Sequence, residues 1–302
     1  MATAGSAAER ERERQARSNR HSLSNLALFA SHRARLTEAI LERLAAPGGA
    51  RLCVLGAGNC HDLELARLAE RYREIHLVDL DEQAIQQARD RQPLAVRERL
   101  VLHASLDLSQ MLVELDGYRA LELTPERLAR HPELASERLV RALGAGFDAV
   151  VSACVLSQMQ LALRTELSDE HPLFSAASYT LSLTHLRTLS ALLSPGGRAL
   201  LVSDAANEQM APLGALDPDA NLLELLVRLV LAGDVFHSVD PLLLSQMSLD
   251  DPTLASDLSV YPIRDVWLWQ LTAERRYLVY ALLLERNGLS AGVSEPLAGP
   301  QR

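Results

Sequence analysis

The feature that most constrains the fold of this chain is a regular alternation of short apolar runs with helical stretches. Five apolar runs, each long enough for one strand, lie at 51–55, 75–79, 100–103, 147–152 and 198–202. Sequence with helical periodicity or helix-capping residues separates them. Strands joined through helices require a parallel sheet with helices on both faces. The pattern therefore predicts an α/β fold built on a doubly wound, mostly parallel sheet.

Two further apolar runs predict how the sheet closes. Residues 266–270 and 277–285 are separated by only six residues, so they are expected to form an antiparallel hairpin and to bring the sheet to seven strands. Two insertions, at about 116–146 and 205–261, interrupt the alternation of strands and helices. Long insertions beside the carboxyl edge of a sheet are typical of segments that cover a substrate.

The remaining sequence divides the chain into four predicted parts. Residues 1–20 are small, polar and charged, which predicts a disordered tail or a frayed helix. Residues 21–50 are expected to form an N-terminal helical segment, since apolar residues recur there at helical spacing. Residues 51–286 would form the main domain, and 287–302 a C-terminal tail containing glycine and proline.

Composition excludes several classes of protein. Of 302 residues, 48% are hydrophobic and 23% charged, which excludes a wholly disordered chain. Thirty basic against 39 acidic side chains give a net charge of -9, which argues against a nucleic-acid partner. The apolar runs are too short to span a membrane, and three cysteines without a CxxC pair indicate neither a disulfide framework nor a metal site. We expect a cytoplasmic protein; a homo-oligomer is compatible with the sequence.

A glycine-containing turn is the sharpest local signal. Gly56-Ala57-Gly58 follows the first apolar run directly, and Asp79 ends the second, 23 residues after Gly56. The glycines permit a tight turn and a close approach to a ligand, and a helix predicted from His61 would present free N–H groups. Asp79 has the spacing of a residue that binds a ribose diol. Dinucleotides and S-adenosylmethionine (SAM) are both bound by such an arrangement, but a dinucleotide site favours a third glycine where His61 stands.

A second turn makes the pattern more specific. Pro195-Gly196-Gly197 stands immediately before the fifth run and after a predicted helix over 176–192. Together with the glycine turn, Asp79 and the closing hairpin, this order resembles the class I SAM-dependent methyltransferases over roughly residues 50–286. The resemblance implies SAM as cofactor and in-line transfer of its methyl group to a small-molecule acceptor.

The resemblance also implies a set of cofactor-binding positions. The glycine turn would lie beneath the methionine and ribose, Asp79 would bind the ribose hydroxyls, Leu80 would pack on the adenine, and Asp107 would contact its amino group. The full implied set is Leu55, Gly56, Ala57, Gly58, Asn59, Asp79, Leu80, Ser105, Asp107, Ser152 and Ala153.

Two positions depart from the family pattern. Val54 stands where the family usually has an acidic residue, and Cys60 where it often has a third glycine. The missing carboxylate removes the usual partner of the methionine amino group, and Asp62 and Glu64 are the nearby acids that could replace it. The departures also keep two alternatives open: a non-catalytic binding or scaffold protein with this fold, and an NAD(P)-dependent oxidoreductase.

Residues on the acceptor side are less clearly indicated. Methyl transfer needs a nucleophile held in line and, where necessary, a group that removes its proton. The candidates at or beyond the ends of the fourth and fifth strands are Ser157, Gln158, His171, Tyr179, His185 and Asp204.

Several other residues in this part have plainer interpretations. His185 is expected to be buried among leucines of its helix, and Cys154 is not expected to act as a nucleophile. His237 fits either the pocket or solvent. Trp267 and Trp269 alternate with Leu268, so both rings lie on one face of a strand, where core packing is favoured over stacking on a substrate.

Overall fold

The computed structural model describes residues 5–44, 49–112, 115 and 123–288. Its strands are β1 (Arg51–Leu55), β2 (Glu74–Val78), β3 (Leu100–His103), β4 (Phe147–Ala153), β5 (Leu193–Asn207), β6 (Leu258–Val260), β7 (Asp265–Thr272) and β8 (Arg275–Arg286). Its α-helices are α1 (Ala7–Ser24), α2 (Ala30–Arg43), α3 (Leu65–Arg71), α4 (Glu82–Asp90), α5 (Leu94–Arg97), α7 (Pro125–Leu143), α8 (Val155–Leu167), α9 (Phe174–Leu192), α10 (Leu222–Ala232), α11 (Pro241–Asp250) and α12 (Pro252–Asp257). No helix in these ranges is long and apolar enough to cross a membrane.

The strands form one sheet in the order β3-β2-β1-β4-β5-β8-β6, with β7 paired to β8 as well. Strands β1 to β5 are parallel, whereas β8 is antiparallel to β5, β6 and β7. The predicted doubly wound sheet and its closing hairpin are confirmed. The sheet has eight strands where seven were expected, because β6, a short strand within the insertion at 205–261, pairs with β8.

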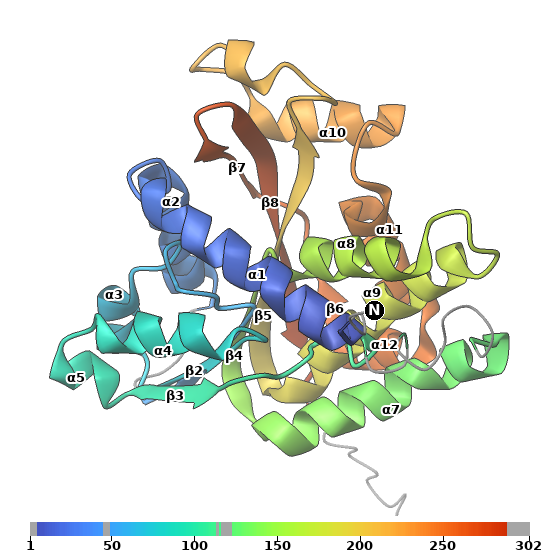
Figure 1. Cartoon of the computed structure of the whole chain (residues 1–302), viewed down its shortest axis with the longest axis horizontal. Helices are drawn as coiled ribbons and strands as arrows, with labels where there is room; N and C mark the ends of the chain where they lie inside the picture. The colour runs from blue at the N-terminus through green and yellow to red at the C-terminus, as the bar shows by residue number, and fades with distance from the viewer. Residues whose placement is uncertain (1–4, 45–48, 113–114, 116–122, 289–302) are drawn as a thin grey trace, which may run out of the picture.

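Alternate residues of the parallel strands belong to two separate hydrophobic cores, one on each face of the sheet. Leu52 and Val54 pack with residues of α2, α3 and α4 on one face, while Cys53 and Leu55 pack with residues of α7, α8 and α9 on the other. Figure 1 shows these helix layers on either side of the sheet. Because both faces are covered, most residues of β1, β2 and β4 are apolar and buried. The carboxyl ends of β1, β2 and β4 are therefore where polar groups can gather.

The N-terminal segment differs from the prediction of a disordered tail over residues 1–20. Helix α1 begins at Ala7, and a reciprocal capping box fixes its start: Ser6 Oγ accepts from the Glu9 N–H, and the Glu9 carboxylate accepts from the Ser6 N–H. Ala7 is fully buried in the core beside α7 and α8. The helix lies across the carboxyl edge of the sheet (Figure 1). Tertiary contacts therefore order a segment whose composition alone indicates disorder.

The helix after β1 also differs from its prediction. It was expected from His61, but α3 begins at Leu65, and residues 56–64 form a loop in which Cys60 has a φ of 51°. The Glu64 N–H donates to Thr37 Oγ1 of α2 at 3.0 Å. The N-terminal N–H groups of α3 are thus several residues away from the glycine turn. Parts of two other predictions, residues 116–122 of the first insertion and 289–302 of the C-terminal tail, lie outside the described residues.

Candidate functional site

The glycine turn lies where the strand order reverses. Connections from β1 and β4 run to opposite sides of the sheet, so a crevice opens between their carboxyl ends. Gly56 has a φ of +75°, and a Cβ placed on it would lie 2.4 Å from Val155 Cβ. The Gly56 and Ala57 N–H groups both donate to Val78 O, at 2.9 and 3.1 Å. Only glycine therefore allows the backbone at position 56 to pass beneath α8 and form the floor of the crevice.

Asp79 directly follows β2, and its carboxylate holds the glycine turn by a hydrogen bond. Its Oδ2 accepts from the Gly58 N–H at 2.7 Å, and its Oδ1 accepts from the Asp81 N–H at 2.8 Å. The residue is only 5% exposed, and burial raises the pKa of its carboxyl from 3.8 to about 6. A carboxylate has about four acceptor sites, so beside the N–H groups of Gly58, Leu80 and Asp81 it keeps capacity for a ligand donor.

A cavity of about 570 Å³ opens above this turn. Its described lining comprises Gln15, Ser18, Asn19, His21, Ser22, Asn25, Phe29, Gly56, Ala57, Gly58, Asn59, His61, Asp62, Asp79, Ala153, Cys154, Gln158, Trp269, Leu271, Thr272, Glu274 and Arg275. Three carboxylates and one guanidinium occur in that set. Burial lowers the pKa of His61 to about 4, so its ring is neutral at pH 7. The described lining of the cavity therefore carries more negatively charged than positively charged side chains.

Asp62 is the second acid of this cavity, and its side chain is half-buried. Burial, reinforced by the charge of Asp79, raises the pKa of the Asp62 carboxyl to about 6. Among the described residues the Asp62 carboxylate forms no ion pair, and the charge of Arg33 only moderates its pKa. Glu64, the other acid considered at this position, instead pairs with Arg67 at 2.9 Å. The structure therefore places Asp62, and not Glu64, at the cavity.

A second, narrower cavity adjoins the first. Gln15, Gly56 and Asp79 line both, and Glu11, Leu80, Leu106, Asp107, Leu108, Ser109, Leu112, Val155, Met159 and Ala162 complete its described lining. The Asp107 carboxylate stabilises the loop in which it lies. Its oxygens accept from the N–H and hydroxyl of Ser109, at 2.8 and 2.6 Å, and from the Leu112 N–H at 3.1 Å. This second cavity encloses only about 20 Å³, so it is a narrow extension of the larger one toward Asp107, and the two together form the cleft.

Three other positions in the implied cofactor set lie away from this cleft. Leu55 is fully buried in the core. Ser105 is exposed at a φ of 56°, and its hydroxyl donates to Glu82 at 3.4 Å. Ser152 is fully buried and forms a 2.7 Å hydrogen bond with Nε2 of His185, a histidine that is 1% exposed as expected from its leucine neighbours. Neither Ser152 nor Ser105 lines the described cavities.

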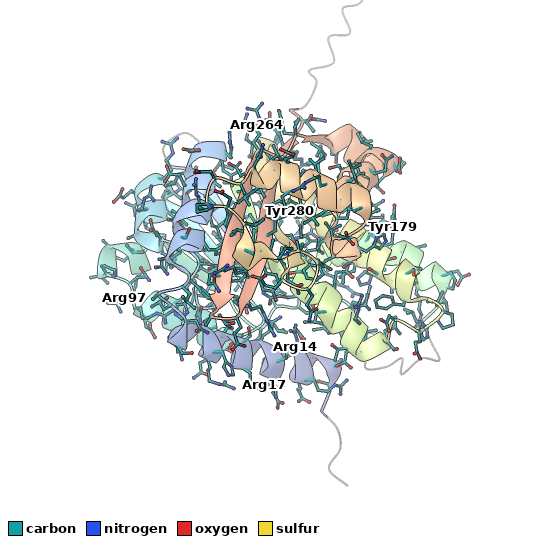
Figure 2. All side chains as sticks on the ribbon, turned by 90° about the horizontal axis from the view of Figure 1, so that it is seen from above. Arg14, Arg17, Arg97, Tyr179, Arg264 and Tyr280 are labelled. Atoms are coloured by element: carbon teal, nitrogen blue, oxygen red, sulfur yellow. The ribbon has the colours of Figure 1, made fainter. Side chains whose placement is uncertain are left out.

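The predicted acceptor-side residues are dispersed. Gln158 lines the larger cavity, and the Ser157 hydroxyl donates to the Cys154 carbonyl at 3.2 Å. His171 is half-buried and its Nδ1 accepts from the Leu173 N–H. Tyr179 is 45% exposed and lies at the periphery of the molecule in Figure 2. His237 is likewise exposed. Of this group the structure brings only Gln158 to the cavity wall.

An aromatic wall faces the acidic side of the cavity. Trp269 lines the cavity, stacks on His32 at 4.3 Å and meets Phe29 edge-on at 5.5 Å. Trp267 is a core residue as predicted, 5% exposed, and its Nε1 donates to His32 Nδ1 at 2.9 Å. The alternation in the sequence predicts that the two tryptophans lie on one face of the strand. Which ring is buried in the core and which lines the cavity depends on how α2 packs against β7.

Asp204 lies behind this wall on β5. It pairs across the sheet with Val279, in the row next to Trp269 and Tyr277, so these side chains share one face. Its Oδ1 is buried without a hydrogen-bond partner among the described residues, and burial raises the pKa of its carboxyl. Its charge in turn raises the pKa of Cys154 and Tyr277, so the carboxylate is close to both. Asp204 is therefore a candidate proton acceptor beside the cavity.

The strand order, the antiparallel β8 beside β5, the glycine turn after β1 and the acid after β2 define a Rossmann-like, doubly wound fold. No protein-family profile and no curated protein matches the chain. Three similar solved structures carry these names: TrmN from Thermus thermophilus, magnesium protoporphyrin IX methyltransferase (ChlM) from Synechocystis PCC 6803 with bound SAH, and a SAM-dependent methyltransferase from Methanosarcina mazei.

The similarity to these structures is distant. Identity is 15% to TrmN, 15% to ChlM and 12% to the Methanosarcina protein, with TM-scores of 0.43, 0.42 and 0.43. The alignments cover 83%, 88% and 81% of this chain, and 48%, 84% and 95% of the other chains. The chain thus spans about half the length of TrmN.

Proposed function

We propose that this protein is a SAM-dependent methyltransferase acting on a small-molecule acceptor. The observation that carries the proposal is a pair of carboxylates, buried Asp79 and half-buried Asp62, in a cleft at the switch point of the sheet. Bound SAM would supply an electrophilic methyl group on a positively charged sulfonium, and it also carries an ammonium and a ribose diol. An electronegative cleft suits such a ligand.

The same charge distribution disfavours the dinucleotide alternative. A pyrophosphate needs N–H groups of a helix N-terminus or cationic side chains close to the glycine turn. Here α3 begins only at Leu65, and Asp62 adds a second carboxylate beside Asp79. Arg33 and Arg91 reach the loop after the turn, but their guanidinium groups already donate to His61 and Asn59. The additional carboxylate of Asp62 would repel a pyrophosphate.

Each acid has a distinct proposed role. Asp79 holds the turn through Gly58 and can accept a hydrogen bond from a ribose hydroxyl. Asp62 takes the place of the carboxylate that is missing at Val54, and its oxygens would accept from the ammonium of the methionine part. Val54 is itself fully buried in the core, so an acid there would face the apolar cluster around α2 and α3.

The acceptor would bind between the aromatic wall and Gln158. Trp269 and Phe29 offer flat apolar surfaces to an acceptor of modest size, and Gln158 offers an amide that both donates and accepts. Asp204, close to Cys154 and Tyr277, is the proposed acceptor of the proton that the nucleophile loses. The acidic lining and the net charge of -9 support a small molecule over a nucleic acid.

Calorimetric titration tests the cofactor assignment. The protein is titrated with SAM and S-adenosylhomocysteine (SAH), and in parallel with NADH and NADPH. Micromolar binding of the two sulfur compounds alone supports the proposal, while binding of nicotinamide cofactors alone overturns it. A screen with methyl-labelled SAM against small amines, phenols and carboxylic acids then separates an enzyme from a non-catalytic binding protein, since only an enzyme yields a labelled product.

A further inference from the structure

Helix α1 forms the roof of the cleft described above. Gln15, Asn19 and Ser22, about one helical turn apart, line the larger cavity, and Glu11 and Gln15 line the narrower one. One face of a single helix therefore follows the whole cleft. Figure 1 shows α1 lying across the carboxyl edge of the sheet, and Figure 2 shows Arg17, from the same helix, at the edge of the molecule.

Glu11 is unusual on this helix because it is a buried carboxylate. It is 5% exposed, and its oxygens accept from Arg14 at 2.6 and 2.7 Å and from Gln15 Nε2 at 2.9 Å. The three side chains thus form a fixed polar cluster over the half of the cleft that contains Leu80 and Asp107. A ligand in that half would meet this cluster on one side and the ends of β2 and β3 on the other.

Helix α1 is attached mainly through polar contacts. Only Ala7 and Glu11 of its 18 residues are buried. Asn19 Nδ2 donates to Asp81 Oδ2 at 2.9 Å, and Asn59 Nδ2 donates to the Asn19 carbonyl at 2.9 Å. Near its start, Arg10 Nε donates to Glu166 of α8 at 3.0 Å. A segment held by few apolar contacts and many polar ones opens at a lower free energy than the rest of a fold.

We propose that α1 is a hinged wall of the cleft: Glu11 and Gln15 face the adenosyl part of the ligand, and the helix lifts to let the ligand enter and leave. This inference rests on the proposed function for the identity of the ligand. Bound ligand adds contacts to the inner face of α1, so it holds the helix closed. Loosening the attachment of α1 then speeds ligand release without altering any group in the cleft.

Hydrogen exchange of the full-length protein tests the closing of the helix. Amide exchange of peptides from residues 7–24 is compared with and without saturating SAH, with peptides from α10 as the internal reference. SAH is expected to slow exchange in α1 and to leave α10 unchanged. Unchanged exchange of α1 under conditions where calorimetry shows saturation would overturn the inference and leave the proposed function intact.

A substitution outside the cleft tests the hinge. Glu166→Gln removes the ion pair with Arg10, and neither residue lines a described cavity. We expect SAH to dissociate about two- to fivefold faster from this variant, measured by stopped-flow fluorescence of Trp269. Glu98→Gln, the same change at an exposed site on the far side, is expected to keep the wild-type rate. Equal rates in both variants contradict the hinge; absence of any SAM or SAH binding contradicts the proposed function and the hinge together.

Discussion

The substitution Asp62→Asn is expected to raise the stability of this protein and to lower its affinity for SAM. The folded protein raises the pKa of the Asp62 carboxyl from 3.8 to about 6, chiefly through burial. The folded state therefore binds the proton more tightly than the unfolded state, and folding stability falls as pH rises from about 4 to about 6. Above pH 6 the Asp62 carboxyl is ionised in both the folded and the unfolded state, so its ionisation then lowers the free energy of unfolding by the largest amount.

The pKa difference sets the size of the effect. About 1.4 kcal/mol per pKa unit gives an upper limit of about 3 kcal/mol above pH 6. Asparagine has nearly the same shape and carries no charge, so Asp62→Asn is expected to raise the free energy of unfolding at pH 8 by about 1–3 kcal/mol and to have little effect at pH 4. The same change removes the proposed partner of the ligand ammonium, so SAM binding should weaken by about 1.5–3 kcal/mol.

Two measurements on one variant check the reasoning. Urea unfolding at pH 4 and pH 8 gives the stability term, and calorimetry with SAM at pH 8 gives the binding term. Asp219→Asn, which makes the same change on an exposed carboxylate, is the control and should alter neither quantity. A variant that is less stable than the wild type at pH 8 refutes the buried-charge argument. Unchanged SAM affinity refutes the assignment of Asp62 to the ammonium.

Four further outcomes follow from the site. Asp79→Ala should weaken SAM binding by about 1.5–3 kcal/mol in calorimetry, and unchanged affinity would mean that the ribose lies elsewhere. Gly56→Ala should lower the unfolding free energy by about 1–3 kcal/mol in thermal denaturation, because the new Cβ would lie 2.4 Å from Val155 Cβ and the φ of +75° strains any side chain; unchanged stability would contradict this close approach. SAM binding at pH 6 should release protons from Asp62, seen as a dependence of the binding enthalpy on the buffer, and buffer-independent enthalpy would contradict a protonated Asp62. The thiol of Cys53, which is buried and lines neither cavity, should react with a thiol reagent only after unfolding, and rapid reaction of this residue in the native protein would contradict its burial.

The positions that the sequence predicted well depend on local chemistry. The turn at Gly56 and the place of Asp79 directly after β2 could be predicted because a strand, a glycine turn and an acid at the end of the next strand are consecutive in the chain. The cap of α4 is equally local, since Asp81 Oδ1 accepts from the Ala84 N–H at 3.2 Å. The start of α3 was predicted four residues too early, because the hydrogen bond from the Glu64 N–H to Thr37 of another helix cannot be seen in local sequence.

The residues that the sequence missed belong mostly to α1. Gln15, Asn19 and Ser22 line the cleft. The first two stand in the polar segment predicted to be a disordered tail or a frayed helix, and Ser22 stands in the predicted helical segment. One available signal was the capping box of Ser6 and Glu9, which marks a helix start in sequence. No comparable signal indicated which side of that helix would be covered.

The sequence by itself determined the parallel sheet, the closing hairpin and the turn at Gly56, because strand periodicity and backbone freedom are properties of a few neighbouring residues. Tertiary structure alone decided that α1 covers the cleft, since Asn19 reaches Asp81 across 62 positions of the chain. It also turned Asp62 toward the cavity and Ser152 toward His185. The direction in which a polar side chain points depends on partners brought from distant elements, and those partners are fixed only when the sheet and its helices pack.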